Sequence, residues 1–143
     1  MTWVVLAQAL CLKEVSACDI VVGLLGSRYG WAPDNYGIAP RDEFEWVSRY
    51  PAGRSITELE VSWGVLNSCT DRASKVKRSL FYFRKEDFLD DVPPRQQSVF
   101  VDGSFNEEEQ VFVPNVRART MLEMLKVKVR APTLGCGQAL PVP

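Results

Sequence analysis

The strongest feature of the hydrophobic pattern is a short apolar run, Ile20-Val-Val-Gly-Leu-Leu25, which follows Asp19 and ends at Gly26. A run of this length bounded by glycine is typical of a β-strand that is buried on both faces, and we predict such a strand at 20–25. The loop that follows, residues 26–33, is rich in glycine and aromatic residues. Because ligands of open α/β sheets usually bind beyond the carboxyl ends of the strands, this loop is a first candidate for a binding site.

Apolar residues recur at helical spacing before this strand. The pattern predicts a helix over residues 3–17, with one apolar face made of Trp3, Val4, Ala7, Leu10, Cys11 and Val15. A second helix is predicted to begin at Ser55-Ile-Thr-Glu58, a capping box in which the Ser55 hydroxyl accepts from the Glu58 backbone N–H. Its apolar stripe, which runs to about residue 67, consists of Ile56, Leu59, Trp63 and Leu66.

A second buried strand is predicted at 79–84, where the aromatic residues favour a strand, and a right-handed crossover should place it parallel to the first. Together these elements predict an α/β fold: an incomplete doubly wound parallel sheet, flavodoxin-like or TIR-like, with flanking helices. We expect one domain over residues 1–131 and a disordered tail over 132–143. Because buried strands need cover on both faces and neighbours on both edges, we also expect the chain to be a fragment of a larger protein.

The remaining segments carry weaker patterns. A short helix is expected at 41–50, with Phe44, Val47 and Tyr50 turned inward, and a loop or single helical turn at 85–92. Residues 102–110 are acidic and polar, which indicates exposure to solvent. A helix is predicted at 116–126 with Met121, Leu122 and Leu125 on its apolar face, and the alternation of residues 126–130 predicts an edge strand.

Composition excludes several kinds of chemistry. The chain has 143 residues, a net charge of −1 and no histidine, so Ser-His-Asp and Cys-His catalysis are excluded. The balanced charge predicts no attraction to membranes and no direct DNA binding. Four cysteines, at 11, 18, 69 and 136, lack zinc-site spacing, and we interpret them as buried reduced thiols of a cytosolic protein. No metal site and no cofactor are predicted, since a phosphate-binding loop motif is also absent.

Two groups of residues are candidates for function. Glu58 and Asp19 are the candidate catalytic carboxylates, because an acidic residue at the start of a strand and one early in the next helix resemble the layout of deoxyribosyltransferase-like and TIR-like N-glycosidases, in which one carboxylate stabilises an oxocarbenium-like centre. The capping box accounts for Glu58 equally well without catalysis. The long loop supplies a candidate interaction surface, whose residues would otherwise pack within the loop: Arg28, Tyr29, Trp31, Tyr36 and Trp46.

Three ordered motifs, residues 12–33, 55–60 and 80–84, resemble the uncharacterised α/β domain that precedes the NACHT nucleotide-binding module in many animal signalling and scaffold ATPases. Residues 35–60 are most similar to the form of this domain found in a telomerase- and vault-associated scaffold. The family's opening strand has no counterpart here, so the resemblance implies a partial pre-NACHT domain. It implies a non-catalytic interaction domain of a large ribonucleoprotein-associated ATPase.

The resemblance also implies protein partners within a large scaffold, RNA contact only through regions outside this chain, and a location in the cytoplasm and also in the nucleus. The alternative is an enzyme: a nucleotide N-glycosidase such as an NADase, resembling the TIR and deoxyribosyltransferase-like enzymes, in which Glu58 would be catalytic.

Overall fold

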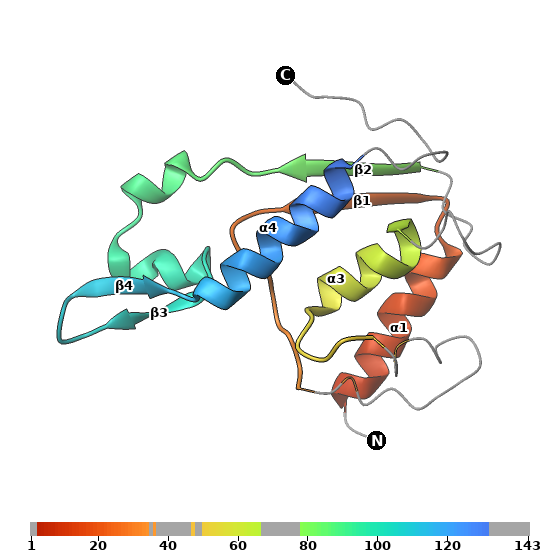
Figure 1. Cartoon of the computed structure of the whole chain (residues 1–143), viewed down its shortest axis with the longest axis horizontal. Helices are drawn as coiled ribbons and strands as arrows, with labels where there is room; N and C mark the ends of the chain where they lie inside the picture. Colours follow the sequence, from red (N-terminus) through yellow and green to blue (C-terminus); the bar gives the residue numbers. More distant parts are fainter. Residues whose placement is uncertain (1–2, 35, 37–46, 48–49, 67–77, 132–143) are drawn as a thin grey trace. The chain divides into compact units, whose positions relative to one another are not determined.

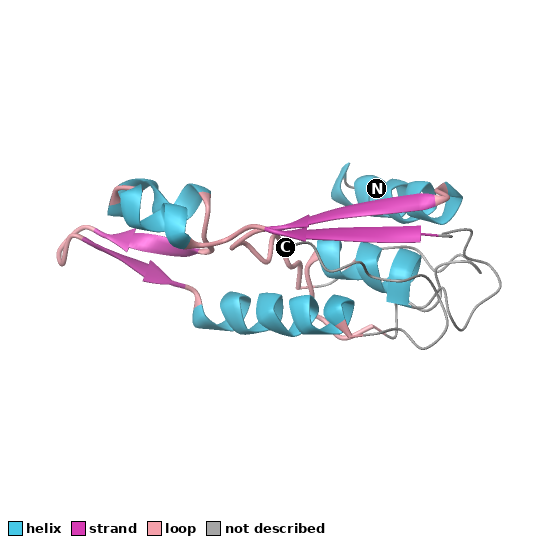
Figure 2. Ribbon diagram, turned by 90° about the horizontal axis from the view of Figure 1, so that it is seen from above, coloured by secondary structure: helices cyan, strands magenta, loops and turns pink. Residues whose placement is uncertain are grey.

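The computed structural model describes residues 3–34, 36, 47, 50–66 and 78–131, with side chains of the first helix described from Leu10 onward. The fold is α/β, as predicted, with a short parallel sheet and flanking helices (Figures 1 and 2). The chain divides into two compact units. Of the described residues, the first unit contains 3–21, 31–34, 36, 47, 50–66 and 78–79, and the second contains 22–30 and 80–131.

Helix packing forms the core of the first unit. Helix α1 (Trp3–Ala17) contacts α3 (Ile56–Val61) and the π-helical turn η2 (Ser62–Leu66) that continues it. The two predicted helices are therefore confirmed, the second with a widened last turn. Four buried residues form the cluster at the centre of this unit: Leu12, Tyr36, Val47 and Leu59.

The apolar face predicted for α1 is wrong at its centre. Leu12 is 1% exposed and belongs to the core, whereas Leu10, which was placed on the buried face, is 56% exposed. Apolar residues surround this helix on all sides, so periodicity alone gives a weak signal for which face is buried. Ser16 then fixes the helix orientation, because its hydroxyl accepts from the Trp63 indole N–H and donates to the Leu12 carbonyl at 2.8 Å.

Strands β1 (Ile20–Leu25) and β2 (Arg78–Phe83) pair with each other. The Arg78 N–H donates to the Asp19 carbonyl at 3.3 Å, and the Arg84 N–H donates to the Leu25 carbonyl at 2.9 Å. Both pairs have the same sequence offset, so the strands run parallel, as predicted. Gly23 lets the ring of Phe81 approach the β1 backbone, since a Cβ atom at this position would overlap the ring.

The prediction that β1 is buried on both faces is wrong. Exposure alternates along the strand, and Ile20, Val22 and Leu24 are exposed. Among the described residues, only one face of β1 is therefore covered, although the strand is apolar along its whole length. Leu25, at the end of the strand, is buried.

The second unit contains a β-hairpin that was not predicted from the sequence. Two 3-10 turns, η3 (Asp87–Asp91) and η4 (Pro94–Val99), lead to β3 (Gly103–Asn106) and β4 (Val111–Pro114). These strands pair antiparallel, with Phe105 opposite Phe112. The polar segment 102–110 is thus a strand and a turn. Of the two alternatives predicted for 85–92, a loop or a single helical turn, the structure shows the helical turn, as η3.

Helix α4 (Val116–Arg130) follows the hairpin (Figure 1). Asn115 caps it, because its side-chain oxygen accepts from the Ala118 N–H at 3.0 Å. Leu122 and Leu125 are buried as predicted. The edge strand predicted at 126–130 is wrong: these residues form the last turns of α4, and the Arg130 guanidinium lies 4.1 Å from the centre of the Phe83 ring.

Two predicted segments fall largely outside the described residues. Of the helix expected at 41–50, only Val47 and Tyr50 are described; Val47 is buried, as predicted. The tail at 132–143 lies outside them entirely. None of the helices in the described part of the chain is both long enough and apolar enough to span a membrane.

Candidate functional site

Glu58 stands in the first turn of α3, and the local sequence explains why. Ser55 is the N-cap: its backbone is extended, and its Oγ accepts from the Glu58 N–H at 3.2 Å. The predicted capping interaction from Ser55 is therefore confirmed. An acidic residue in this turn is also stabilised by the partial positive charge of the helix N-terminus. The Glu58 side chain is 1% exposed.

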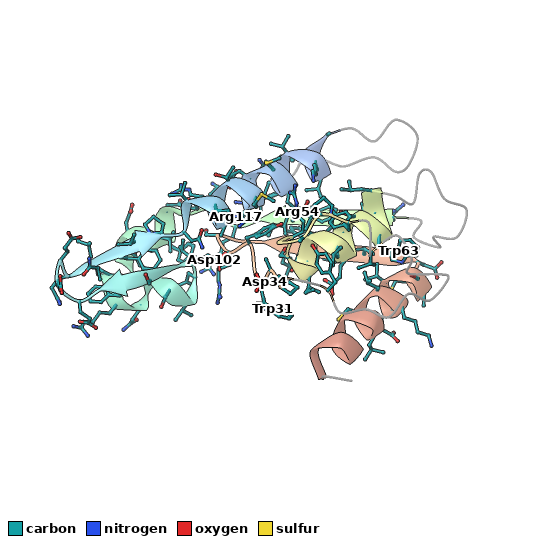
Figure 3. All side chains as sticks on the ribbon, turned by 60° about the horizontal axis from the view of Figure 1, so that its bottom comes forward. Trp31, Asp34, Arg54, Trp63, Asp102 and Arg117 are labelled. Atoms are coloured by element: carbon teal, nitrogen blue, oxygen red, sulfur yellow. The ribbon has the colours of Figure 1, made fainter. Side chains whose placement is uncertain are left out.

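A buried carboxylate requires charged or hydrogen-bonding partners, and the preceding loop supplies them. Glu58 Oε1 accepts from Arg54 Nη1 at 3.4 Å and from the Tyr50 hydroxyl at 3.4 Å. The Tyr50 hydroxyl also lies 2.7 Å from the Ser62 Oγ. Figure 3 labels Arg54 at the start of α3. These contacts link Glu58 to the loop before α3 and to the turn after it.

Tyr36 extends this network into the core. Its hydroxyl donates to the Pro51 carbonyl at 2.6 Å and accepts from the Arg54 N–H at 3.1 Å. Burial, the main cause, raises the pKa of Tyr36, so the phenol stays protonated at neutral pH. Tyr36, predicted as part of an interaction loop, is buried at the centre of the first unit.

The other candidate residues of the first unit lie in different surroundings. Asp19 is exposed just before β1. Trp31 is 57% exposed, and its carbonyl accepts from the Ile56 N–H at 3.2 Å. Trp46 lies outside the described residues. The roles of Asp19, Glu58, Trp31 and Trp46 stay predictions.

In the second unit, the loop after β1 is fixed by Asp102, a residue that the sequence reading did not single out. Asp102 Oδ2 accepts from the Tyr29 N–H at 2.6 Å, and Oδ1 accepts from Arg28 Nε at 3.3 Å. The Asp102 carbonyl accepts from the Asn115 N–H at 2.7 Å. The signal that could have found it is the Asp-Gly pair at 102–103, a common turn dipeptide.

These contacts involve the loop 26–33, which the sequence made a first candidate for a binding site. Ser27 forms a parallel bridge with Val101, and the Tyr29 side chain is buried. Gly30 follows with φ of 90°, which other residues rarely adopt. The carboxyl end of β1 is therefore bound by the protein's own residues 101–102.

Arg84 follows directly after β2. Its guanidinium lies 3.6 Å from the centre of the Phe88 ring and 5.4 Å from that of Phe100. The two rings meet edge to face, with centroids 5.3 Å apart. Arg84 is thus held by cation–π contacts that order the segment after β2.

The described cysteines, Cys11 and Cys18, are free thiols. Burial is the main reason why the pKa of the Cys11 thiol is raised, and a hydrogen bond to Glu60 raises it further. The reactive thiolate form of Cys11 is therefore disfavoured. Cys18 is exposed, which contradicts the expectation that all the thiols are buried; it falls just past the end of α1. Burial likewise raises the pKa of Glu60.

Comparison with known proteins gives several relatives, three of which are described. The chain is 39% identical over 94 residues to telomerase protein component 1 of Mus musculus and, equally, to that of Rattus norvegicus. Each match covers 66% of this chain and 4% of the relative. A TPR repeat-containing protein of Dictyostelium discoideum is 28% identical over 115 residues, which cover 72% of this chain and 7% of that protein.

The chain thus spans a small part of the length of each of these relatives. No solved structure matches it. A family model described as a domain of unknown function, DUF4062, matches residues 7–120, which is most of the chain. By that match, the chain belongs to the DUF4062 family.

Proposed function

We propose that this chain is a non-catalytic protein-interaction domain of a large scaffold. The observation that carries the proposal is the similarity to telomerase protein component 1, whose name describes a component of an assembly. The geometry of the candidate sites supports it. Glu58 is enclosed by partners from its own chain, and residues 101–102 fill the end of β1.

The assembly that we propose is a ribonucleoprotein-associated ATPase with a NACHT module, as the sequence resemblance implies. In it, this domain binds other proteins, and RNA is bound by regions outside this chain. The location would be the cytoplasm, with the nucleus as a second compartment.

A graft experiment tests this role. The segment of mouse telomerase protein component 1 that matches this chain is deleted or replaced by residues 7–120, and tagged proteins are purified for quantitative mass spectrometry. We expect deletion to remove a defined set of partner proteins while RNA recovery is kept, and the graft to restore that set. A graft that carries Leu59→Asp, which places a charge in the core, is the control that should fail. Unchanged partners after deletion would overturn the proposal.

One observation favours a second candidate, a nucleotide N-glycosidase. Glu58 lies in the first turn of a helix, and the negative charge of its carboxylate could stabilise a cationic transition state, while the Tyr50 hydroxyl and the Arg54 guanidinium hold that carboxylate in place. The test is to incubate the chain with NAD and to measure nicotinamide release. The enzyme reading requires release that Glu58→Gln abolishes and Glu60→Gln, a matched change on the same helix, preserves. We expect no release, because a carboxylate that is 1% exposed cannot contact a substrate without local opening.

A further inference from the structure

The outer face of α4 exposes apolar side chains in a row. Val116 is 74% exposed, Met124 45% and Val127 63%, and Thr120 lies between them at helical spacing. These four residues, which we call the α4 stripe, line an open groove with a volume of about 710 Å³, and Pro114 lies at one end of the lining. Contiguous exposed apolar patches often mark sites of interaction with another protein.

The stripe is separate from the buried face of α4. Leu122, Leu125 and Lys126 are buried and lie on the opposite side of the helix. The helix is therefore apolar on two sides, and among the described residues only one of these sides is buried. A surface helix of a monomeric domain needs just one apolar stripe, so the second favours a partner.

Charge narrows the choice of that partner. At 100° per residue, Arg119 lies on one side of the stripe, and Arg117 and Lys128 lie on the other. Arg119 and Lys128 also line the groove. Figure 3 labels Arg117 on α4. The stripe is thus apolar along its centre and positively charged along both edges.

The acidic groups near the stripe are already paired. Glu123 lines the groove, and its Oε1 lies 2.8 Å from Lys126 Nζ. Arg119 Nη2 lies 3.4 Å from Glu86 Oε2, and both side chains are exposed. A pair of this kind contributes little, about 0–1 kcal/mol, so a partner's carboxylate can compete for Arg119.

We propose that the α4 stripe docks an acidic amphipathic helix of a partner protein. The apolar residues of that helix would contact Val116, Met124 and Val127, and its flanking glutamate or aspartate residues would contact Arg117, Arg119 and Lys128. Anchors spaced one and two turns apart suit a helix laid along a groove. The apolar centre favours a protein over nucleic acid, which would need phosphate contacts along the whole face. This inference rests on the proposed interaction function and names its surface.

The test uses the complete 143-residue chain and a designed peptide as probe. The probe is an 18-residue fluorescein-labelled peptide with leucine at every third or fourth position and glutamate on both sides of the leucine stripe. Two control peptides have the same composition in scrambled order, or lysine in place of glutamate. Fluorescence anisotropy measures binding at low and at physiological salt.

We expect the acidic peptide to bind at least tenfold more tightly than either control, and more weakly as salt rises because the edge contacts are ionic. Val127→Glu and Arg117→Glu should each weaken binding at least tenfold. Val99→Glu, the same change at a similarly exposed valine outside the groove, should leave binding unchanged. Circular dichroism of each variant checks that it is folded, which these exposed positions should permit.

Equal binding of the scrambled peptide, or no binding of the acidic one, would overturn the proposal. Tighter binding of a single-stranded RNA or of anionic phospholipid vesicles, lost in Val127→Glu, would also overturn it and assign the face to that ligand. A dimer in analytical ultracentrifugation that Val127→Glu dissociates would assign the face to a second copy. If the peptide fails while the graft still restores partners, the interaction function stands and only this surface is wrong.

Discussion

Gly64 sets how closely α1 approaches the turn after α3, and Gly64→Ala tests this directly. A Cβ atom at Gly64 would overlap Val15 Cγ1 and would lie 3.6 Å from Val15 Cβ and 3.9 Å from Val21 Cγ2. Val15 is β-branched and lies in a helix, where one χ1 rotamer dominates, so its methyl group has little freedom to rotate away. We therefore expect α1 and η2 to move apart.

The expected change in the free energy of unfolding of Gly64→Ala follows from two opposing effects. Inserting a methyl group into a packed contact costs about 1–3 kcal/mol. Replacing glycine by alanine in a helix returns up to about 1 kcal/mol, because the unfolded chain loses conformational freedom. The expected net loss in the free energy of unfolding is therefore about 1–2 kcal/mol. Urea titration followed by circular dichroism measures it, and hydrogen exchange of α3 amides localises it.

Two controls make the reasoning refutable. Gly26→Ala adds the same methyl group where no atom lies within 4 Å, so it should be neutral or slightly stabilising. In a Val15→Ala background the overlapping methyl group is gone, and Gly64→Ala should then cost nothing. The reasoning fails if Gly64→Ala is as mild as Gly26→Ala, or if its cost is the same with and without Val15.

Three further predictions concern other parts of the fold. Asp102→Ala should lower the free energy of unfolding by about 1–3 kcal/mol, because the Tyr29 N–H loses its acceptor. Arg28→Ala should lower it by less than about 1 kcal/mol, because the ion pair of Arg28 with Asp102 is exposed. Thermal unfolding of both variants compares the two losses. Burial raises the pKa of Glu60, so the contribution of Glu60 to stability is complete below the ordinary glutamate pKa and is lost as pH rises through the raised value. Glu60→Gln should therefore reduce the change in the free energy of unfolding with pH, as measured by urea titrations. An unchanged pH dependence in the variant would contradict this prediction. Leu59→Ala should cost about 2–5 kcal/mol in the same titration, and a cost below 1 kcal/mol would show that Leu59 is not in a packed core.

Local signals in the sequence predicted much of the fold. The capping residue Ser55, the apolar run 20–25 and the spacing of Leu122 and Leu125 each depend on near neighbours, and each was predicted correctly as an element. One error arose where the sequence fits both a helical and a strand periodicity. Residues 126–130 alternate basic and apolar, which suits a strand, but no glycine or proline separates them from the helix that begins at Val116.

The candidate site was predictable only in part. The Ser55–Glu58 contact is local and was predicted, and it is present. The Tyr50 and Tyr36 contacts depend on how the long loop folds back onto α3, which no short-range pattern encodes. Asp102 was missed because its partners, Arg28 and Tyr29, are separated from it by more than seventy residues.

That separation has a consequence for synthesis on the ribosome. The Tyr29 N–H and its acceptor Asp102 are 73 residues apart in the chain. At about 5–20 residues per second, about 4–15 s pass between the appearance of the two. During that interval the loop after β1 has neither the Asp102 carboxylate nor the bridge from Val101. The loop that leaves β1 can therefore take its final form only several seconds after the strand itself has been made.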